Sequence, residues 1–164
     1  MNVVKQSVLF ISLLWWSISV HAHGFDYSVV RLTETENHTW RLAITSSLDA
    51  FRKEVRLHFS KTPYTTPEEF NEQLLNHISA TLSINAELKS IPLGEGTVSL
   101  GHETSVVFTQ IKLPKSAKQV VLTNGAVKDI YRHTTKLIVT PWAANKQSFI
   151  LNKSNNFTAT IPIR

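Results

Sequence analysis

Histidine is the main candidate for metal binding in this 164-residue chain, which contains seven histidines and no cysteine. Without thiolates, a metal site has to be built from imidazole and carboxylate groups, a ligand set that suits zinc or copper. The absence of cysteine also excludes thiol catalysis, iron–sulfur clusters and lipid attachment through an N-terminal cysteine. Beyond residue 22 the histidines are scattered, and no two of them form a close ligand pair in sequence.

The stretch SISVHAHGFDYS, residues 17–28, gives one histidine a special position. Before it, the chain has the three-part build of a secretory signal: a positive charge at Lys5, an uncharged run over residues 7–20, and Ala22 at the expected cleavage position. The uncharged run is 14 residues long, whereas a membrane-spanning helix needs about 20. We therefore expect cleavage after Ala22, which leaves a single domain over residues 23–164.

Cleavage there makes His23 the first residue of the mature chain. A terminal amine and the imidazole beside it can chelate one ion together, and another histidine then completes a three-nitrogen site. His102 and His133 are the best candidates, because each lies in a connecting segment and loops at one end of a sandwich can converge. The sequence thus predicts copper or zinc at His23, His102 and His133. The alternative, in which His23 merely follows the signal and the loop histidines are solvated, stays open.

Other catalytic arrangements are missing from the sequence. There is no G-x-S-x-G turn for a serine hydrolase and no phosphate-binding loop. Glu68 and Glu69 are adjacent on a predicted helix, where side chains point apart and the helix dipole favours acids. We therefore assign no catalytic residue and expect a non-enzymatic protein. A hydrolase remains an alternative that would require Asp49, His102 and His133 to meet a serine.

The charge of the chain bears on its partners and its compartment. The formal net charge of +5 falls to +4 once Lys5 is removed, and the basic residues are scattered rather than clustered. Nucleic acid is therefore not an expected partner. An exported domain without cysteine is typical of a Gram-negative periplasm, and we expect the protein to be periplasmic.

Two helices are predicted between groups of strands. Charged residues interrupt an apolar repeat of four over DAFRKEVRLHF, which predicts a short helix beginning at the capping residue Asp49. In TTPEEFNEQLLNHISATL, Thr66 can cap a second helix, Pro67 suits its first position, and Glu69 completes a capping box.

Strands are predicted on both sides of these helices. Alternation over residues 25–33 and 40–48 predicts a hairpin, and about six further short strands follow residue 82. In the last of these strands, Phe157, Ala159, Ile161 and Ile163 share one face. The fold class predicted is mainly β: an antiparallel β-sandwich of immunoglobulin type with one or two α-helices inserted after the second strand.

The order of these segments resembles a known family. The exported start with its histidine is followed by SSLDAFRKEVRLHF, then LTNGAVKDIYRHTTKLIV, then KQSFILNKSN. Together they resemble the uncharacterised exported bacterial family catalogued as domain of unknown function 6702. Asn124 and Asp129 fit that family's pattern, whereas Asp49 stands alone where members tend to have an acidic pair. The resemblance implies an exported small domain and supplies no activity.

The function expected from the sequence is that of an exported, non-enzymatic binding or accessory domain whose partner would be a periplasmic or membrane protein. A copper or zinc carrier based on His23 is the first alternative, and a hydrolase is the second.

Overall fold

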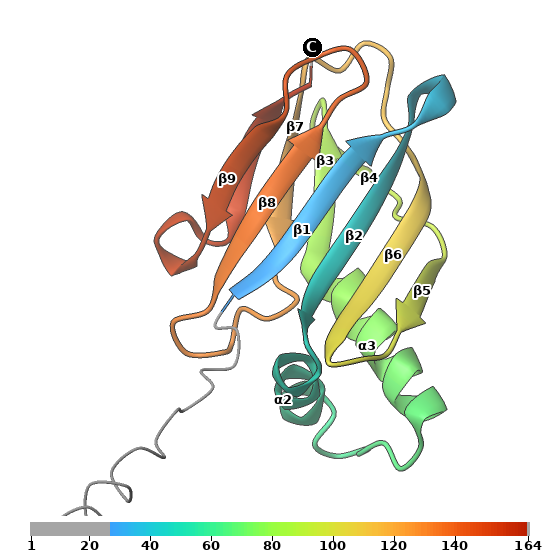
Figure 1. Ribbon diagram of the computed structural model, residues 1–164, viewed down its shortest axis with the longest axis vertical. Helices are drawn as coiled ribbons and strands as arrows, with labels where there is room; N and C mark the ends of the chain where they lie inside the picture. The colour runs from blue at the N-terminus through green and yellow to red at the C-terminus, as the bar shows by residue number, and fades with distance from the viewer. Residues whose placement is uncertain (1–26, 164) are drawn as a thin grey trace, which may run out of the picture.

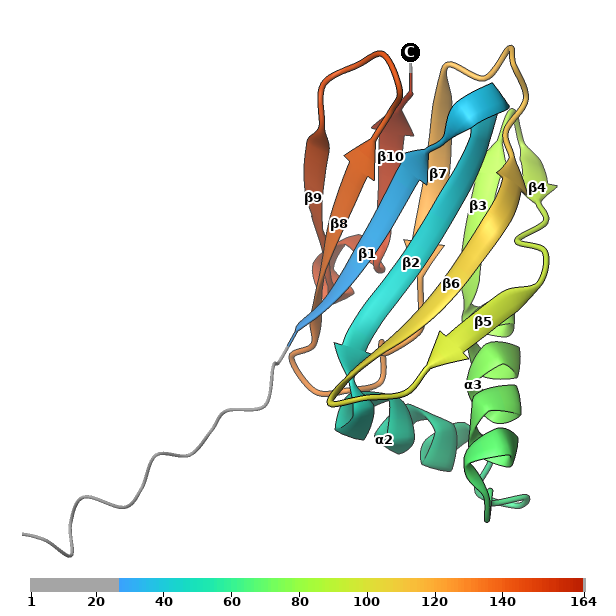
Figure 2. The ribbon, with the colours of Figure 1, turned by 45° about the vertical axis from the view of Figure 1, so that its right-hand side comes forward.

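The computed structural model describes residues 27–163, which form two β-sheets packed face to face, with two helices at one end (Figures 1 and 2). The larger sheet contains, in spatial order, β5 (Gly96–Ser99), β6 (Glu103–Lys112), β2 (Thr39–Ser47), β1 (Tyr27–Glu34), β8 (Thr134–Thr140) and β9 (Gln147–Leu151). The smaller sheet contains β10 (Thr158–Pro162), β7 (Gln119–Asn124), β3 (Leu82–Ala86) and β4 (Lys89–Ile91).

The core lies between the two sheets and follows the alternation of the strands. In β1 and β2, Val30 pairs with Ile44 and Leu32 with Leu42, and all four side chains are buried. The smaller sheet contributes inward-facing residues of its own, among them Ile84, Leu122 and Ile161. These observations confirm the predicted sandwich. One feature was not predicted: β1 and β8 pair in parallel, whereas the other strand pairs are antiparallel.

Helix α2 (Leu48–His58) follows the second strand, as expected from the sequence. The prediction that Asp49 caps it is wrong. Ser47 is the capping residue, because its side-chain oxygen accepts a hydrogen bond from the Ala50 N–H at 3.2 Å. Asp49 instead lies in the first turn, where an acid suits the positive end of the helix dipole. Phe51 and Val55 face the core.

Helix α3 (Pro67–Thr81) begins as the sequence predicts. Thr66 Oγ1 accepts a hydrogen bond from the Glu69 N–H at 3.2 Å, and Glu69 Oε2 accepts one from the Thr66 N–H at 3.3 Å. Both halves of the capping box are therefore present. The buried face of α3 carries Phe70, Leu74 and Ile78.

Replacement of Thr66 with alanine is expected to lower the free energy of unfolding by about 1 kcal/mol, because the Glu69 N–H at the helix start loses its acceptor. Urea denaturation of the Thr66→Ala protein would measure this loss. Ser79→Ala, on an exposed part of the same helix, is the matched control and should change the stability by less than about 0.5 kcal/mol.

The ends of the sandwich differ in what they contain. At the end with α2 and α3, β2 finishes and β1, β6 and β8 begin, so that the loop over residues 125–133, between β7 and β8, reaches the helices (Figure 1). The opposite end holds the β1–β2 connection, with its short 3-10 helix η1 (Glu36–His38), and the loop between β8 and β9. A second 3-10 helix, η2 (Lys153–Asn155), precedes β10.

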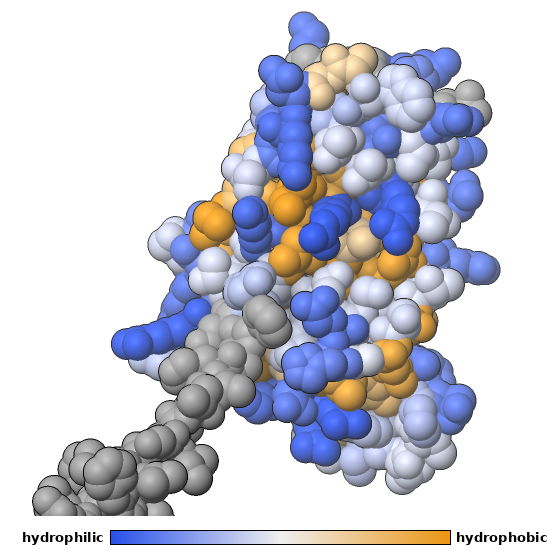
Figure 3. All heavy atoms as spheres, in the orientation of Figure 1, coloured by the Kyte–Doolittle hydropathy of each residue, from blue (hydrophilic) through white to orange (hydrophobic). Residues whose placement is uncertain are grey.

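The outer face of the larger sheet is mixed in character. Figure 3 shows hydrophobic side chains there between strongly hydrophilic ones. Among residues 27–163, neither helix has the length and apolar character needed to span a membrane.

Candidate metal centre

The structure places two of the three histidines predicted to bind metal, His102 and His133, at separate positions. His23 lies outside the described residues. His102 is exposed in the turn before β6, and its carbonyl accepts a hydrogen bond from the Leu48 N–H at 3.2 Å. His133 is buried immediately before β8, and its backbone N–H donates to the Ile130 carbonyl at 3.1 Å.

His102 and His133 stand at the same end of the larger sheet but do not meet. The strands they precede, β6 and β8, are separated by β2 and β1. Three strand spacings of about 4.8 Å put the two backbones roughly 14 Å apart, which is too far for both to bind one ion. Asp49, the acid considered with them, pairs with Arg52 at 4.0 Å.

A different group of side chains converges between the helices. One ligand atom each from Glu54, His58 and His77 lies within 4.8 Å of the others, and within residues 27–163 this is the one group of three or more such residues. Glu54 and His58 are four residues apart on α2 and therefore share a face. His77 projects from α3. The site thus joins the two helices.

The distances within this group are close to those of a tetrahedral metal site. Glu54 Oε2 lies 3.5 Å from His58 Nε2 and 3.5 Å from His77 Nε2. The centroids of the two imidazole rings are 4.6 Å apart. Ligands bound at 2.0–2.1 Å around a tetrahedral zinc ion lie roughly 3.4 Å from one another. Small shifts of the rings are therefore enough to coordinate an ion.

Burial gives the carboxyl group of Glu54 unusual properties. Its side chain is fully buried, and Oε2 has no hydrogen-bond partner within the described part of the chain. Removal from water raises the pKa of Glu54 to about 7, although a hydrogen bond from the Asp129 N–H works in the opposite direction. Burial also lowers the pKa of His77. Near neutral pH, His77 is therefore a neutral imidazole, the form that binds metal.

The loop over residues 125–133 contacts every member of the group. The Asp129 N–H donates to Glu54 Oε1 at 2.8 Å, and Asp129 Oδ2 accepts from His58 Nε2 at 2.9 Å. The Ala126 carbonyl accepts from His77 Nε2 at 3.0 Å. His58 and Asp129 keep 37% and 36% of their side-chain surface exposed. The group is therefore open to solvent on the side where these two residues lie.

Asn124 fixes the start of this loop. Its side-chain oxygen accepts a hydrogen bond from the Ala126 N–H at 3.3 Å, and its amide nitrogen donates to Thr135 Oγ1 at 3.1 Å. The next residue, Gly125, packs against the end of α3, where a Cβ atom would lie 2.8 Å from the Thr81 carbonyl oxygen. A larger residue would push the loop away from the helix. Asn124 and Gly125 therefore place Ala126 and Asp129 against the site.

Binding of an ion requires an exchange of hydrogen bonds. In the structure, Nε2–H of His77 donates to a carbonyl and Nε2–H of His58 donates to a carboxylate. A metal would occupy the Nε2 lone pairs, so each ring would carry its proton on Nδ1 instead. The 125–133 loop would then lose two of its contacts with the helices. Metal binding and loop position are coupled for this reason.

Sequence reasoning missed this group for an identifiable reason. The Glu54-x-x-x-His58 spacing is a detectable signal, since it puts a carboxylate and an imidazole on one helical face. Glu54 is, however, one of the charged residues that interrupt the apolar repeat of the predicted helix, and nothing in that repeat indicates that it is buried. His77 is buried, and its partners come from distant parts of the chain.

No protein-family model matches the chain, and no curated protein shows significant similarity to it.

Proposed function

We propose that the protein is an exported binding or accessory domain that holds a single zinc or copper(II) ion between Glu54, His58 and His77. The observation that carries this proposal is the convergence of two imidazoles on a buried carboxylate oxygen that has no hydrogen-bond partner among the described residues. Such a group is costly to bury unless something satisfies it, and a divalent cation would do so. The N-terminal signal pattern supports export, to a Gram-negative periplasm.

The donor atoms favour particular ions. Two imidazoles and a carboxylate suit zinc and copper(II), whereas copper(I) prefers thiolate and thioether ligands. The chain has no cysteine, and its single methionine is residue 1. Three protein ligands leave one tetrahedral position for water or for a group on a partner. An ion held in this way could be passed on, which suits an accessory role.

Calorimetric titration of the full chain with zinc at pH 7.5 tests the proposal. We expect one zinc ion per chain, and we expect His77→Ala and His58→Ala to reduce the affinity at least about tenfold, because each removes a ligand. His102→Ala, which changes an exposed histidine outside the group, should bind as the wild type does. Thermal unfolding of each variant without metal verifies that it folds.

Two results would contradict the proposal. One is unchanged zinc binding by His77→Ala. The other is loss of binding in His102→Ala, which would favour the site predicted from His23, His102 and His133 instead.

A further inference from the structure

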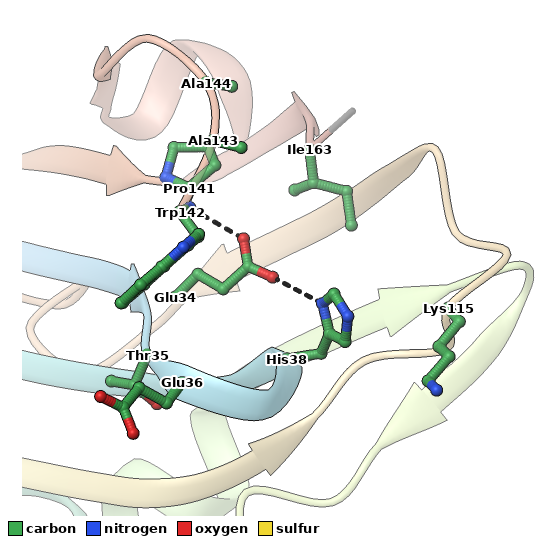
Figure 4. Close-up of a pocket in the computed structure, with 10 residues that line it drawn as sticks. All are labelled: Glu34, Thr35, Glu36, His38, Lys115, Pro141, Trp142, Ala143, Ala144 and Ile163. Carbon is green, nitrogen blue, oxygen red and sulfur yellow. Dashed lines mark hydrogen bonds and ion pairs between the residues drawn. The ribbon is translucent and has the colours of Figure 1, made fainter.

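A second site is indicated at the opposite end of the sandwich from Glu54, His58 and His77. The loops there surround a cavity of about 970 Å³ (Figure 4), which is within the usual size range of small-molecule sites. Its wall is formed by the β1–β2 connection, the β6–β7 loop, the start of the β8–β9 loop and the end of the chain after β10.

Trp142 is a large apolar side chain that is held in an exposed position. It follows Thr140, which pairs with Thr33, so it emerges beside the end of β1. Its backbone N–H donates to Glu34 Oε2 at 2.9 Å, and the preceding Pro141 is buried. The side chain nevertheless remains 67% exposed. Trp40, by contrast, is 2% exposed within the core. The backbone at Trp142 is therefore fixed while its indole ring is left available for a ligand.

The polar groups around this ring differ in charge and in hydrogen-bonding role. Glu34 Oε1 accepts a hydrogen bond from His38 Nδ1 at 3.2 Å, which leaves His38 Nε2 available for a hydrogen bond with a ligand (Figure 4). His38 adopts a left-handed backbone conformation with φ of 57°, which is uncommon outside glycine. Glu36 adds an exposed carboxylate, and Lys115 adds an ammonium group from the β6–β7 loop.

We propose that this cavity binds a saccharide, with one sugar ring stacked on Trp142. Glu34 and Glu36 disfavour a simple anion, and the lining carries both carboxylate and ammonium groups, which suits a neutral ligand with hydrogen-bond donors and acceptors. Hydroxyl groups both donate and accept hydrogen bonds, so those of a sugar can pair with an imidazole, a carboxylate or an ammonium group of this lining. The apolar C–H face of a sugar ring matches the exposed indole, whose amphipathic character suits a partner that is polar at its edges.

Calorimetric titration of the full chain with glucose, galactose, N-acetylglucosamine and their β1,4-linked dimers tests this inference. At least one of these is expected to bind with a dissociation constant of roughly 1 mM or lower. Trp142→Ala should weaken that binding at least tenfold, and Trp142→Tyr should restore part of it because a ring is retained. Tyr131→Ala is the matched control, since Tyr131 is also an exposed aromatic residue but belongs to the 125–133 loop, and it should bind as the wild type does.

The results of these titrations distinguish a saccharide site from a cation site and from the zinc site. Failure of every saccharide to bind, or equal binding by Trp142→Ala and the wild type, would overturn the proposal. Binding of choline or spermidine in place of the sugars would also overturn it and identify a cation site. The result is independent of zinc binding, because Trp142→Ala leaves Glu54, His58 and His77 unchanged.

Discussion

Replacement of Glu54 with glutamine is expected to weaken zinc binding by at least about 100-fold and, at the same time, to make the metal-free protein more stable at pH 8. The loss of affinity follows because an anionic ligand becomes a neutral amide. Loss of a residue that only hydrogen-bonds to a metal ligand typically reduces metal affinity 10- to 100-fold, and loss of a charged ligand should reduce it more. The gain in stability follows because the amide cannot ionise inside the protein. A variant that binds zinc more weakly but is more stable without metal would identify Glu54 as a residue retained for binding.

The pKa of Glu54 sets the size and pH range of the gain. Its value is about 7 in the folded protein, against an ordinary value of 4.5, so the folded state binds the proton more tightly than the unfolded state. The contribution of Glu54 to stability therefore falls as the pH rises from about 4.5 to about 7, and it stays low above that range. Each unit by which the pKa is shifted corresponds to about 1.4 kcal/mol. The free energy of unfolding of Glu54→Gln should therefore exceed that of the wild type by up to about 3 kcal/mol at pH 8 and by almost nothing at pH 4.

Urea denaturation at both pH values, compared with the wild type, measures this difference. His77 is unchanged in the variant, so its own titration largely cancels in the comparison. Glu72→Gln, an exposed acid on α3, is the matched control and should alter neither zinc affinity nor stability appreciably. A Glu54→Gln protein that is less stable than the wild type at pH 8 would mean that the carboxylate is a structural partner of the histidines.

The elements of this fold that are encoded locally could be predicted from the sequence. The capping box at Thr66 and Glu69 depends on residues three positions apart, and strand alternation depends on neighbours two positions apart. In β10 and the residues that flank it, the predicted inner face of Phe157, Ala159, Ile161 and Ile163 is buried or partly buried. These signals do not require knowledge of what lies across the core.

The candidate site could not be predicted in this way, because its parts come from three distant segments. Glu54 stands among charged residues at 52, 53 and 56, which suggest a solvated face, but it is buried because α3 and the 125–133 loop cover that side of α2. In the sequence, Asp129 carries no signal beyond its fit to a family pattern. Its role depends on the loop fixed by Asn124 and Gly125. Pairing between distant segments is set by tertiary packing, which a single sequence does not reveal.

Zinc affinity is expected to fall about tenfold for each pH unit below 7, and to be nearly constant above that value. The ligand is the ionised carboxylate, so below the pKa of Glu54, about 7, zinc must displace one proton. His77 adds little in the upper part of this range, because burial lowers its pKa below 6.5 and it is already neutral there. Between pH 7 and pH 5, Glu54 alone should therefore weaken binding by about 100-fold.

Calorimetry in two buffers of different ionisation enthalpy measures this effect directly, because it counts the protons released on binding. At pH 6 the wild type is expected to release about one proton per zinc ion more than Glu54→Gln does, and at pH 8 the two proteins should release nearly the same number. The zinc-dependent rise in melting temperature should grow over the same pH interval, since stabilisation by a ligand increases with its affinity. Equal proton release by wild type and Glu54→Gln at pH 6 would show that Glu54 does not bind the ion, even if both histidines do. The difference in proton release thus tests the carboxylate separately from the imidazoles, because both proteins contain His58 and His77.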